Sequence, residues 1–197
     1  MTGPDLEGRL KGALSAPGRA SSDYDLNSDI ALPAARKLTP ASVLIGVRAV
    51  SGQVVLTKRS ARLKHHPGQI AFAGGRQDPE DSDATAAALR EAREEIGLNP
   101  DQVRVLGTLP PHETVTRYQV TPVVALIEGD FDPIPEEGEV SEVFEVPIAH
   151  VTDPLNYLIQ SRHWQGRARY YYTVPFGPYY IWGATARILR SLADRMS

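Results

Sequence analysis

The order of apolar and polar positions predicts several strands, with one helix between them and another at the C-terminal end. Residues 42–50 and 53–59 are β-branched runs separated by Ser51-Gly52, which predicts a hairpin. Residues 83–96 are rich in Ala, Leu, Glu and Arg and precede Gly97, a pattern typical of a helix that ends at a glycine. Further strands are predicted at 103–109, 118–127, 143–147 and 164–173, and a second helix at about 184–195.

The first forty residues carry a weaker pattern. Leu6, Leu10 and Leu14 have the spacing of one face of a short helix, whereas the chain from there to residue 40 has the proline, glycine and serine content of irregular structure. We predict that residues 1–40 are an N-terminal extension of the same domain and that residues 41–197 form its main part. The mixture of strands and helices favours an α+β fold in which helices sandwich a mixed sheet.

Composition narrows the class of protein. The 197 residues suffice for one domain with its own core, and the absence of cysteine excludes disulfides, thiolate zinc sites and a cysteine nucleophile. A cytoplasmic, reducing location is therefore expected. No signal-like N-terminus and no membrane-length apolar run is present, so no membrane partner is expected. With a formal charge of −3 and no long basic block, a nucleic-acid partner is not expected either, although a small phosphorylated ligand fits local basic clusters.

Three glutamates of the central predicted helix share one side. Glu91 and Glu95 are four residues apart, and Glu91 and Glu94 are three apart, which brings their carboxylates together on a helix. Such a cluster repels itself unless a hard cation binds it, and Mg²⁺ or Mn²⁺ prefers oxygen ligands. Arg90, four residues before Glu94, is placed to orient that carboxylate by a two-pronged contact. Taken alone, a helix rich in Glu and Arg is more often only a solvated surface.

The loop before this helix favours the functional interpretation. Gly74-Gly75 lets the backbone turn sharply and brings carbonyls close to a ligand or metal ion. Asp78 and Asp81 follow at the start of the helix, where we expect them to serve as caps more than as catalysts. A glycine turn that leads into a helix with three carboxylates is suited to hold cations against a diphosphate. Metal bound there would lower the pKa of an attacking water.

Residues 75–98 resemble the Nudix box, in which glycine, five residues, glutamate and seven residues precede Arg-Glu-U-x-Glu-Glu-x-Gly-U, where U is bulky and aliphatic. The C-terminal half matches from Arg90 to Leu98, with the small Ala92 at the first aliphatic position. Asp81 stands where glutamate is expected, and eight residues separate it from Arg90. That spacing is similar to the branch of the family that hydrolyses coenzyme A.

An upstream motif also resembles the coenzyme A branch. Its signature is Leu-Leu-Thr-x-Arg-Ser, then Arg, Gly and Phe-Pro-Gly-Gly, each after three intervening residues. This chain has Val55-Leu-Thr-Lys-Arg-Ser60, Lys64, Gly68 and Phe72-Ala-Gly-Gly75 at the same spacing. Lysine at position 64 keeps the charge of arginine but loses its planar fork. The resemblance covers roughly residues 40–190.

The resemblance implies the Nudix α/β/α sandwich and a pyrophosphohydrolase that cleaves coenzyme A or acyl-coenzyme A into adenosine 3′,5′-bisphosphate and phosphopantetheine. It implies Mg²⁺ or Mn²⁺ held by Glu91, Glu94 and Glu95, with the Gly74 carbonyl as a further ligand. Arg59, Arg62 and Lys64, beside the glycine loop, are expected to contact the substrate phosphates, including the 3′-phosphate. At most one of His65 and His66 is expected to face the site. The candidate catalytic residues are Arg90, Glu91, Glu94 and Glu142, and the candidate substrate-binding residues are Arg59, Arg62, Lys64, Gly74 and Gly75.

Some questions stay open. The general base is Glu94 on the helix, or Glu139 or Glu142 in the acidic stretch that precedes a strand. The C-terminal aromatics are able to stack on adenine, but such clusters more often form core or a homodimer contact, which we favour: Tyr170, Tyr171, Tyr172, Tyr179, Tyr180 and Trp182. The alternative substrates are ADP-ribose and dinucleotides, and the alternative class is a non-catalytic binder of coenzyme A or a nucleotide.

Overall fold

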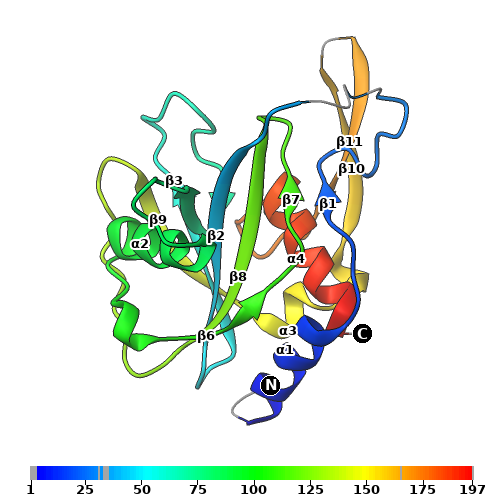
Figure 1. The fold of residues 1–197 in the computed structure, drawn as a ribbon. Helices are drawn as coiled ribbons and strands as arrows, with labels where there is room; N and C mark the ends of the chain where they lie inside the picture. The colour runs from blue at the N-terminus through cyan, green and yellow to red at the C-terminus, as the bar shows by residue number, and fades with distance from the viewer. Residues whose placement is uncertain (1–3, 31, 33–35, 165, 197) are drawn as a thin grey trace.

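A mixed β-sheet runs through the centre of the molecule in the computed structural model, which describes residues 4–30, 32, 36–164 and 166–196 (Figure 1). The strand order is β1-β7-β8-β2-β3-β4, while β5 pairs with β2, β6 with β8 and β9 with β3. The two long central strands, β2 and β8, are parallel. The elements are α1 (Pro4–Ser15), β1 (Ser21–Ser22), β2 (Thr39–Arg48), β3 (Gln53–Arg59), β4 (Ile70–Ala71), β5 (Ala73–Arg76), α2 (Ala84–Ile96), β6 (Val103–Thr108), β7 (His112–Glu113), β8 (Tyr118–Ile127), β9 (Val140–Pro147), α3 (Ile148–Val151), β10 (Leu158–Trp164), β11 (Arg167–Thr173) and α4 (Gly183–Met196), with 3₁₀ turns at Pro100–Gln102 and Pro154–Asn156.

Helices cover both faces of the sheet, which confirms the predicted α+β sandwich. Figure 1 shows α2 on one side and α4, with α1 and α3, on the other. Each face of the sheet carries its own hydrophobic core. Because side chains alternate along a strand, β2 and β8 contribute residues to both of these cores. Leu44 and Val123 pack with Ala88 and Ala92 of α2, whereas Ile45 belongs to the core under α4. The small alanines let α2 lie close to the sheet.

The N-terminal helix α1 is fastened to the C-terminal helix α4. Leu6 and Leu10 are fully buried, which confirms the predicted short helix. Arg195 of α4 donates to the carbonyls of Ala13 (3.2 Å) and Ala16 (2.7 Å), which satisfies acceptors that a helix end leaves unpaired. From the middle of α1, Arg9 Nη2 donates to the carbonyl of Met196.

Two sequence-based boundaries need correction. Strand β2 already begins at Thr39, inside the stretch expected to be irregular, of which residues 31 and 33–35 lie outside the described part of the chain. The strand predicted at 164–173 is confirmed only over β11 (Arg167–Thr173), because the chain before it forms a second strand, β10, that pairs antiparallel with β11 and places Leu158 opposite Thr173. Leu158 and Ile159 are largely exposed, so β10 lacks the buried alternation by which strands are recognised.

None of the helices within the described residues is long and apolar enough to cross a bilayer.

Candidate active site

Helix α2 presents the carboxylates, and its two ends are well defined. Asp83 caps the N-terminus by accepting from the Ala86 N–H at 2.8 Å, and Gly97 ends the helix in the left-handed conformation. Asp78 and Asp81 are therefore not the caps that the sequence suggested. Asp81 instead accepts from the Asp78 N–H and faces Arg90.

Arg90 joins the glycine loop to the helix. Its Nε and Nη2 bind the two oxygens of Asp81 at 3.0 and 2.9 Å, and Nη2 also donates to the Arg76 carbonyl. Its Nη1 contacts Glu91 and Glu94, each at 3.1 Å. The predicted two-pronged contact with Glu94 is thus wrong, because Asp81 takes the fork of the guanidinium. The hydrogen bond from Arg90 lowers the pKa of Asp81. This network fixes the loop between β5 and α2.

Gly74 and Gly75 allow the carboxylates of α2 to reach the backbone of β5. The Gly74 N–H donates to Glu95 Oε2 at 3.1 Å. A Cβ at position 74 would lie 2.3 Å from the Ser42 carbonyl oxygen, and one at position 75 would lie 2.4 Å from Glu91 Oε1. A larger residue at position 74 would therefore displace the backbone of β2, so glycine is required there, whereas a larger residue at position 75 would move the Glu91 carboxylate from its place beside β5.

Burial and mutual repulsion make the Glu95 carboxylate reluctant to ionise. The residue is only 4% exposed, and burial, together with the charges of Glu91 and Glu139, raises its pKa to about 7. Burial also raises the pKa of Glu91, although Arg90 opposes the shift. A low-dielectric cluster with excess negative charge and only oxygen donors suits Mg²⁺ or Mn²⁺.

The three box glutamates do not share one partner, because Arg90 contacts Glu91 and Glu94 whereas the Gly74 N–H donates to Glu95. The Glu94 side chain is 59% exposed. Within the described residues, no three Asp, Glu or His side chains are already spaced to hold a metal ion. Convergence of Glu91, Glu94 and Glu95 on one cation, with the Gly74 carbonyl, therefore stays a prediction.

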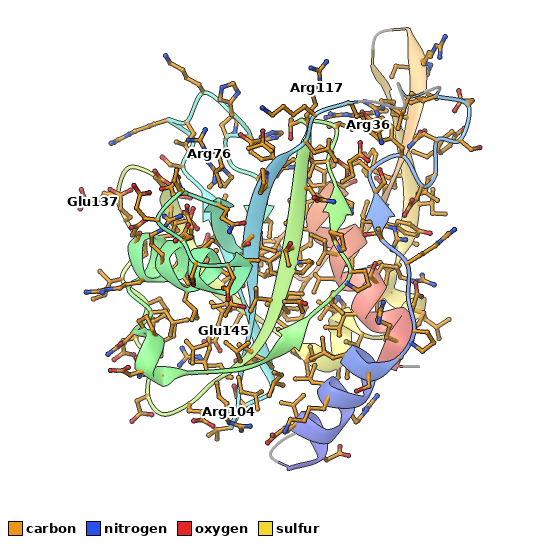
Figure 2. The ribbon with its side chains drawn as sticks, viewed as in Figure 1. Arg36, Arg76, Arg104, Arg117, Glu137 and Glu145 are labelled. Atoms are coloured by element: carbon orange, nitrogen blue, oxygen red, sulfur yellow. The ribbon has the colours of Figure 1, made fainter. Side chains whose placement is uncertain are left out.

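Only one of the three predicted cationic residues lies beside the carboxylates. Arg59 Nη1 is 3.9 Å from Glu95 Oε1, whereas Arg62 and Lys64 are exposed in the following loop. Of the two histidines in that loop, His66 lines the neighbouring cavity and His65 does not. Figure 2 shows Arg76 and Arg117 at this end of the sheet and Arg104 at the opposite end.

A cavity of about 310 Å³ lies on the α4 side of the sheet, and none of the three box glutamates is among the described residues that line it. Arg59 lines it and so faces both the cavity and Glu95. Three of the six predicted aromatics line it as well, namely Tyr170, Tyr171 and Trp182. Elsewhere, Tyr179 stacks on Phe144, Tyr172 packs on Tyr157 and Tyr180 lies near Trp182. Sequence reasoning missed further lining residues, including Asp23, Arg162, Arg169 and Thr116.

A buried histidine holds Asp23 at the cavity wall. His112 is fully buried, with Nδ1 2.9 Å from Ser21 Oγ and Nε2 3.1 Å from Asp23 Oδ1. The other oxygen of Asp23 accepts from the Val115 N–H. These residues come from distant parts of the chain, so no local pattern could have marked them.

The two acidic candidates near β9 differ in position. Glu142 accepts a hydrogen bond from the Tyr179 hydroxyl, and it lies on the side of β9 that carries Phe144, away from α2. Burial and the contact with Arg90 have the larger effects on the pKa of Glu91, and the negative charge of Glu139 also raises it. The same charge raises the pKa of Glu95. Of the two, Glu139 is the one whose charge reaches the box.

Residues 37–170, more than half of the chain, match the model of the NUDIX domain. The chain belongs to the Nudix hydrolase family. A protein of *Escherichia coli* K12 named "Uncharacterized Nudix hydrolase NudL" is 44% identical over 154 residues, which cover 78% of this chain and 80% of the relative. The NudL of *Cronobacter sakazakii* is 43% identical over the same coverage. A solved Ap4A hydrolase complex of *C. elegans*, at 21% identity, covers 55% of this chain and 80% of its own, with a TM-score of 0.46.

Membership in the Nudix family defines the general chemistry. The protein is an enzyme, a pyrophosphohydrolase that acts on a nucleoside diphosphate derivative, and enzymes of this family generally use divalent metal ions. The box from Gly75 to Leu98 therefore indicated the correct family. The coenzyme A motif from Val55 to Gly75 bears on the finer question of substrate.

Proposed function

We propose that this Nudix hydrolase cleaves the diphosphate of coenzyme A or acyl-coenzyme A, with adenosine 3′,5′-bisphosphate and phosphopantetheine or its acyl form as products. The observation that carries the proposal is the position of Arg59, which lies 3.9 Å from Glu95 and also lines the 310 Å³ cavity. A diphosphate beside the carboxylates would thus have its nucleoside side next to a cavity with aromatic walls. The coenzyme A motif contains this same arginine.

The proposed mechanism assigns distinct roles to the site residues. Glu91, Glu94 and Glu95, with the Gly74 carbonyl, would hold Mg²⁺ or Mn²⁺, which supplies charge neutralisation and an acidified water. Arg59 would bind an oxygen of the diphosphate, and Arg90 would keep the glycine loop in place through Asp81. Glu139 is the favoured acceptor of the water proton, ahead of Glu94 and Glu142. Catalysis would then rest on positioning and electrostatics.

Rates on matched substrates test the proposal. The purified enzyme should hydrolyse coenzyme A faster than dephospho-coenzyme A, ADP-ribose and a dinucleotide, with Mg²⁺ and with Mn²⁺, and chromatography should identify adenosine 3′,5′-bisphosphate. Equal or faster turnover of ADP-ribose would remove the coenzyme A assignment. Binding of coenzyme A without release of the bisphosphate would favour the non-catalytic alternative. The partner in this proposal is a small nucleotide met in the cytoplasm.

A further inference from the structure

Two arginines face each other on the β10–β11 hairpin at the cavity wall. Arg162 and Arg169 are register partners on neighbouring strands, and both line the cavity. Side chains at such positions start only about 5 Å apart, and like charges there destabilise a sheet. An anion bound between the two guanidinium groups would remove that repulsion.

Aromatic rings hold both guanidinium groups in place. Arg162 Cζ lies 4.9 Å from the ring centre of Trp182, and Arg169 Cζ lies 5.3 Å from that of Tyr24. Stacking on a ring restricts a long side chain, and the N–H donors of a guanidinium lie at the edge of its plane and not on the stacked face. The two donor groups are therefore ordered before any ligand arrives.

The balance of charge in the cavity also favours an anion. Asp23 is the sole carboxylate among the described lining residues, and it is already bonded to His112 and to the Val115 N–H. Within the described chain, Arg162 forms no ion pair with a carboxylate. Burial lowers the pKa of His66, and the charges of Arg59 and Arg162 lower it further, as expected in a positive field.

Arg59 and the hairpin pair serve different parts of the cavity. Arg59 approaches Glu95 and so belongs with the diphosphate, whereas the pair lies on the hairpin. We propose that Arg162 and Arg169 form a subsite for a phosphate monoester on the nucleotide half of the substrate, separate from the diphosphate that is cleaved. This inference rests on the proposed function and moves recognition of the 3′-phosphate from Arg59 to the hairpin. A phosphate has several acceptor oxygens, so it is able to accept hydrogen bonds from two guanidinium groups at once.

Nucleotide binding without metal tests the subsite independently of hydrolysis. Calorimetry in EDTA should show that the wild type binds adenosine 3′,5′-bisphosphate at least about 10-fold more tightly than 5′-AMP, since the 3′-phosphate adds charge-assisted hydrogen bonds that 5′-AMP lacks. Arg162→Gln and Arg169→Gln should each weaken bisphosphate binding about 10-fold and change AMP binding by less than about 2-fold. Arg167→Gln is the matched control, because Arg167 is exposed on the same hairpin and does not line the cavity.

The outcomes separate the subsite from the proposed function. The subsite would be overturned if the variants bound both nucleotides more weakly by the same factor. It would also be overturned if both variants still preferred the bisphosphate over 5′-AMP as the wild type does, even if coenzyme A is hydrolysed. If coenzyme A is not hydrolysed but the bisphosphate preference depends on Arg162 and Arg169, the subsite stands and the proposed function fails. Thermal midpoints measured alongside should not fall below that of the wild type, because Arg162 is exposed, Arg169 is only partly buried, and each change removes one of two like charges on opposite positions of the hairpin.

Discussion

The carboxylate site and the cavity are built in opposite ways, although Arg59 touches both. Apart from Arg59 and the proposed base Glu139, the carboxylate site comes from one stretch, from Gly74 in β5 to Glu95 in α2, and its contacts are local. The cavity draws residues from Asp23 near the N-terminus to Ile188 in α4. A contiguous motif thus sets the chemistry, while tertiary assembly sets the space beside it. Substrate preference is able to change without alteration of the catalytic helix.

The largest expected effect is at the carboxylate site. Glu95→Gln should lower kcat by at least about 100-fold, because even residues that only support a metal ligand cost 10–100-fold when removed. Steady-state kinetics with saturating Mn²⁺ measures it. Glu137→Gln is the control, since Glu137 is an exposed glutamate of the acidic loop (Figure 2) and should keep full activity. Near-wild-type turnover of Glu95→Gln would show that the ligand assignment is wrong.

A substitution in the cavity wall should chiefly lower the stability of the fold. His112→Ala should reduce the free energy of unfolding by about 3–4 kcal/mol, because it leaves a buried gap and removes the partners of Ser21 and Asp23. Urea unfolding measures the loss, and His65→Ala, at an exposed position, should change it by less than about 0.5 kcal/mol. We also expect KM to rise more than kcat falls. An unchanged unfolding midpoint would mean that His112 does not hold this wall.

Glu95 should make stability depend on pH in the metal-free enzyme. Its pKa of about 7 lies above the ordinary 4.5, so the folded state binds more protons than the unfolded state between these values. The free energy of unfolding should therefore fall as pH rises from about 4.5 to 7, by on the order of 2–3 kcal/mol relative to Glu95→Gln. Urea titrations in EDTA at a series of pH values measure the difference. Parallel pH profiles for the two proteins would contradict this prediction.

The smallest effect on stability is expected at Glu94. Its exposed pairing with Arg90 spans one helical turn, so Glu94→Gln should change the free energy of unfolding by less than about 0.5 kcal/mol. If Glu94 is a metal ligand as proposed, the Glu94→Gln variant should still lose activity. A variant with full activity would remove Glu94 from the ligand set, and a large loss of stability would show that its contact with Arg90 is structural.

The contrast between the regions explains what the sequence revealed. Helical spacing placed Glu91 and Glu95 on one side of α2, and the capping glycine located its end, because these are consequences of local geometry. The contact of Arg90 with Asp81 was missed because it depends on how the loop folds back. The pair Arg162 and Arg169 was invisible, since β10 is too exposed to show an apolar alternation. The role of Asp23 in the cavity wall could not be predicted, because it depends on a contact with His112, which is distant in the sequence.

The fastening of α1 to α4 has a practical consequence. Arg9 reaches the carbonyl of Met196, and Arg195 caps α1, so the first and last helices meet (Figure 1). Figure 1 also shows that they meet at the opposite end of the molecule from the tip of the hairpin. A surface tether or a fused reporter attached at either end would therefore lie away from the β10–β11 hairpin, which carries Arg162 and Arg169 of the cavity wall. The same geometry favours joining the ends by a short linker and reopening the chain in an exposed loop.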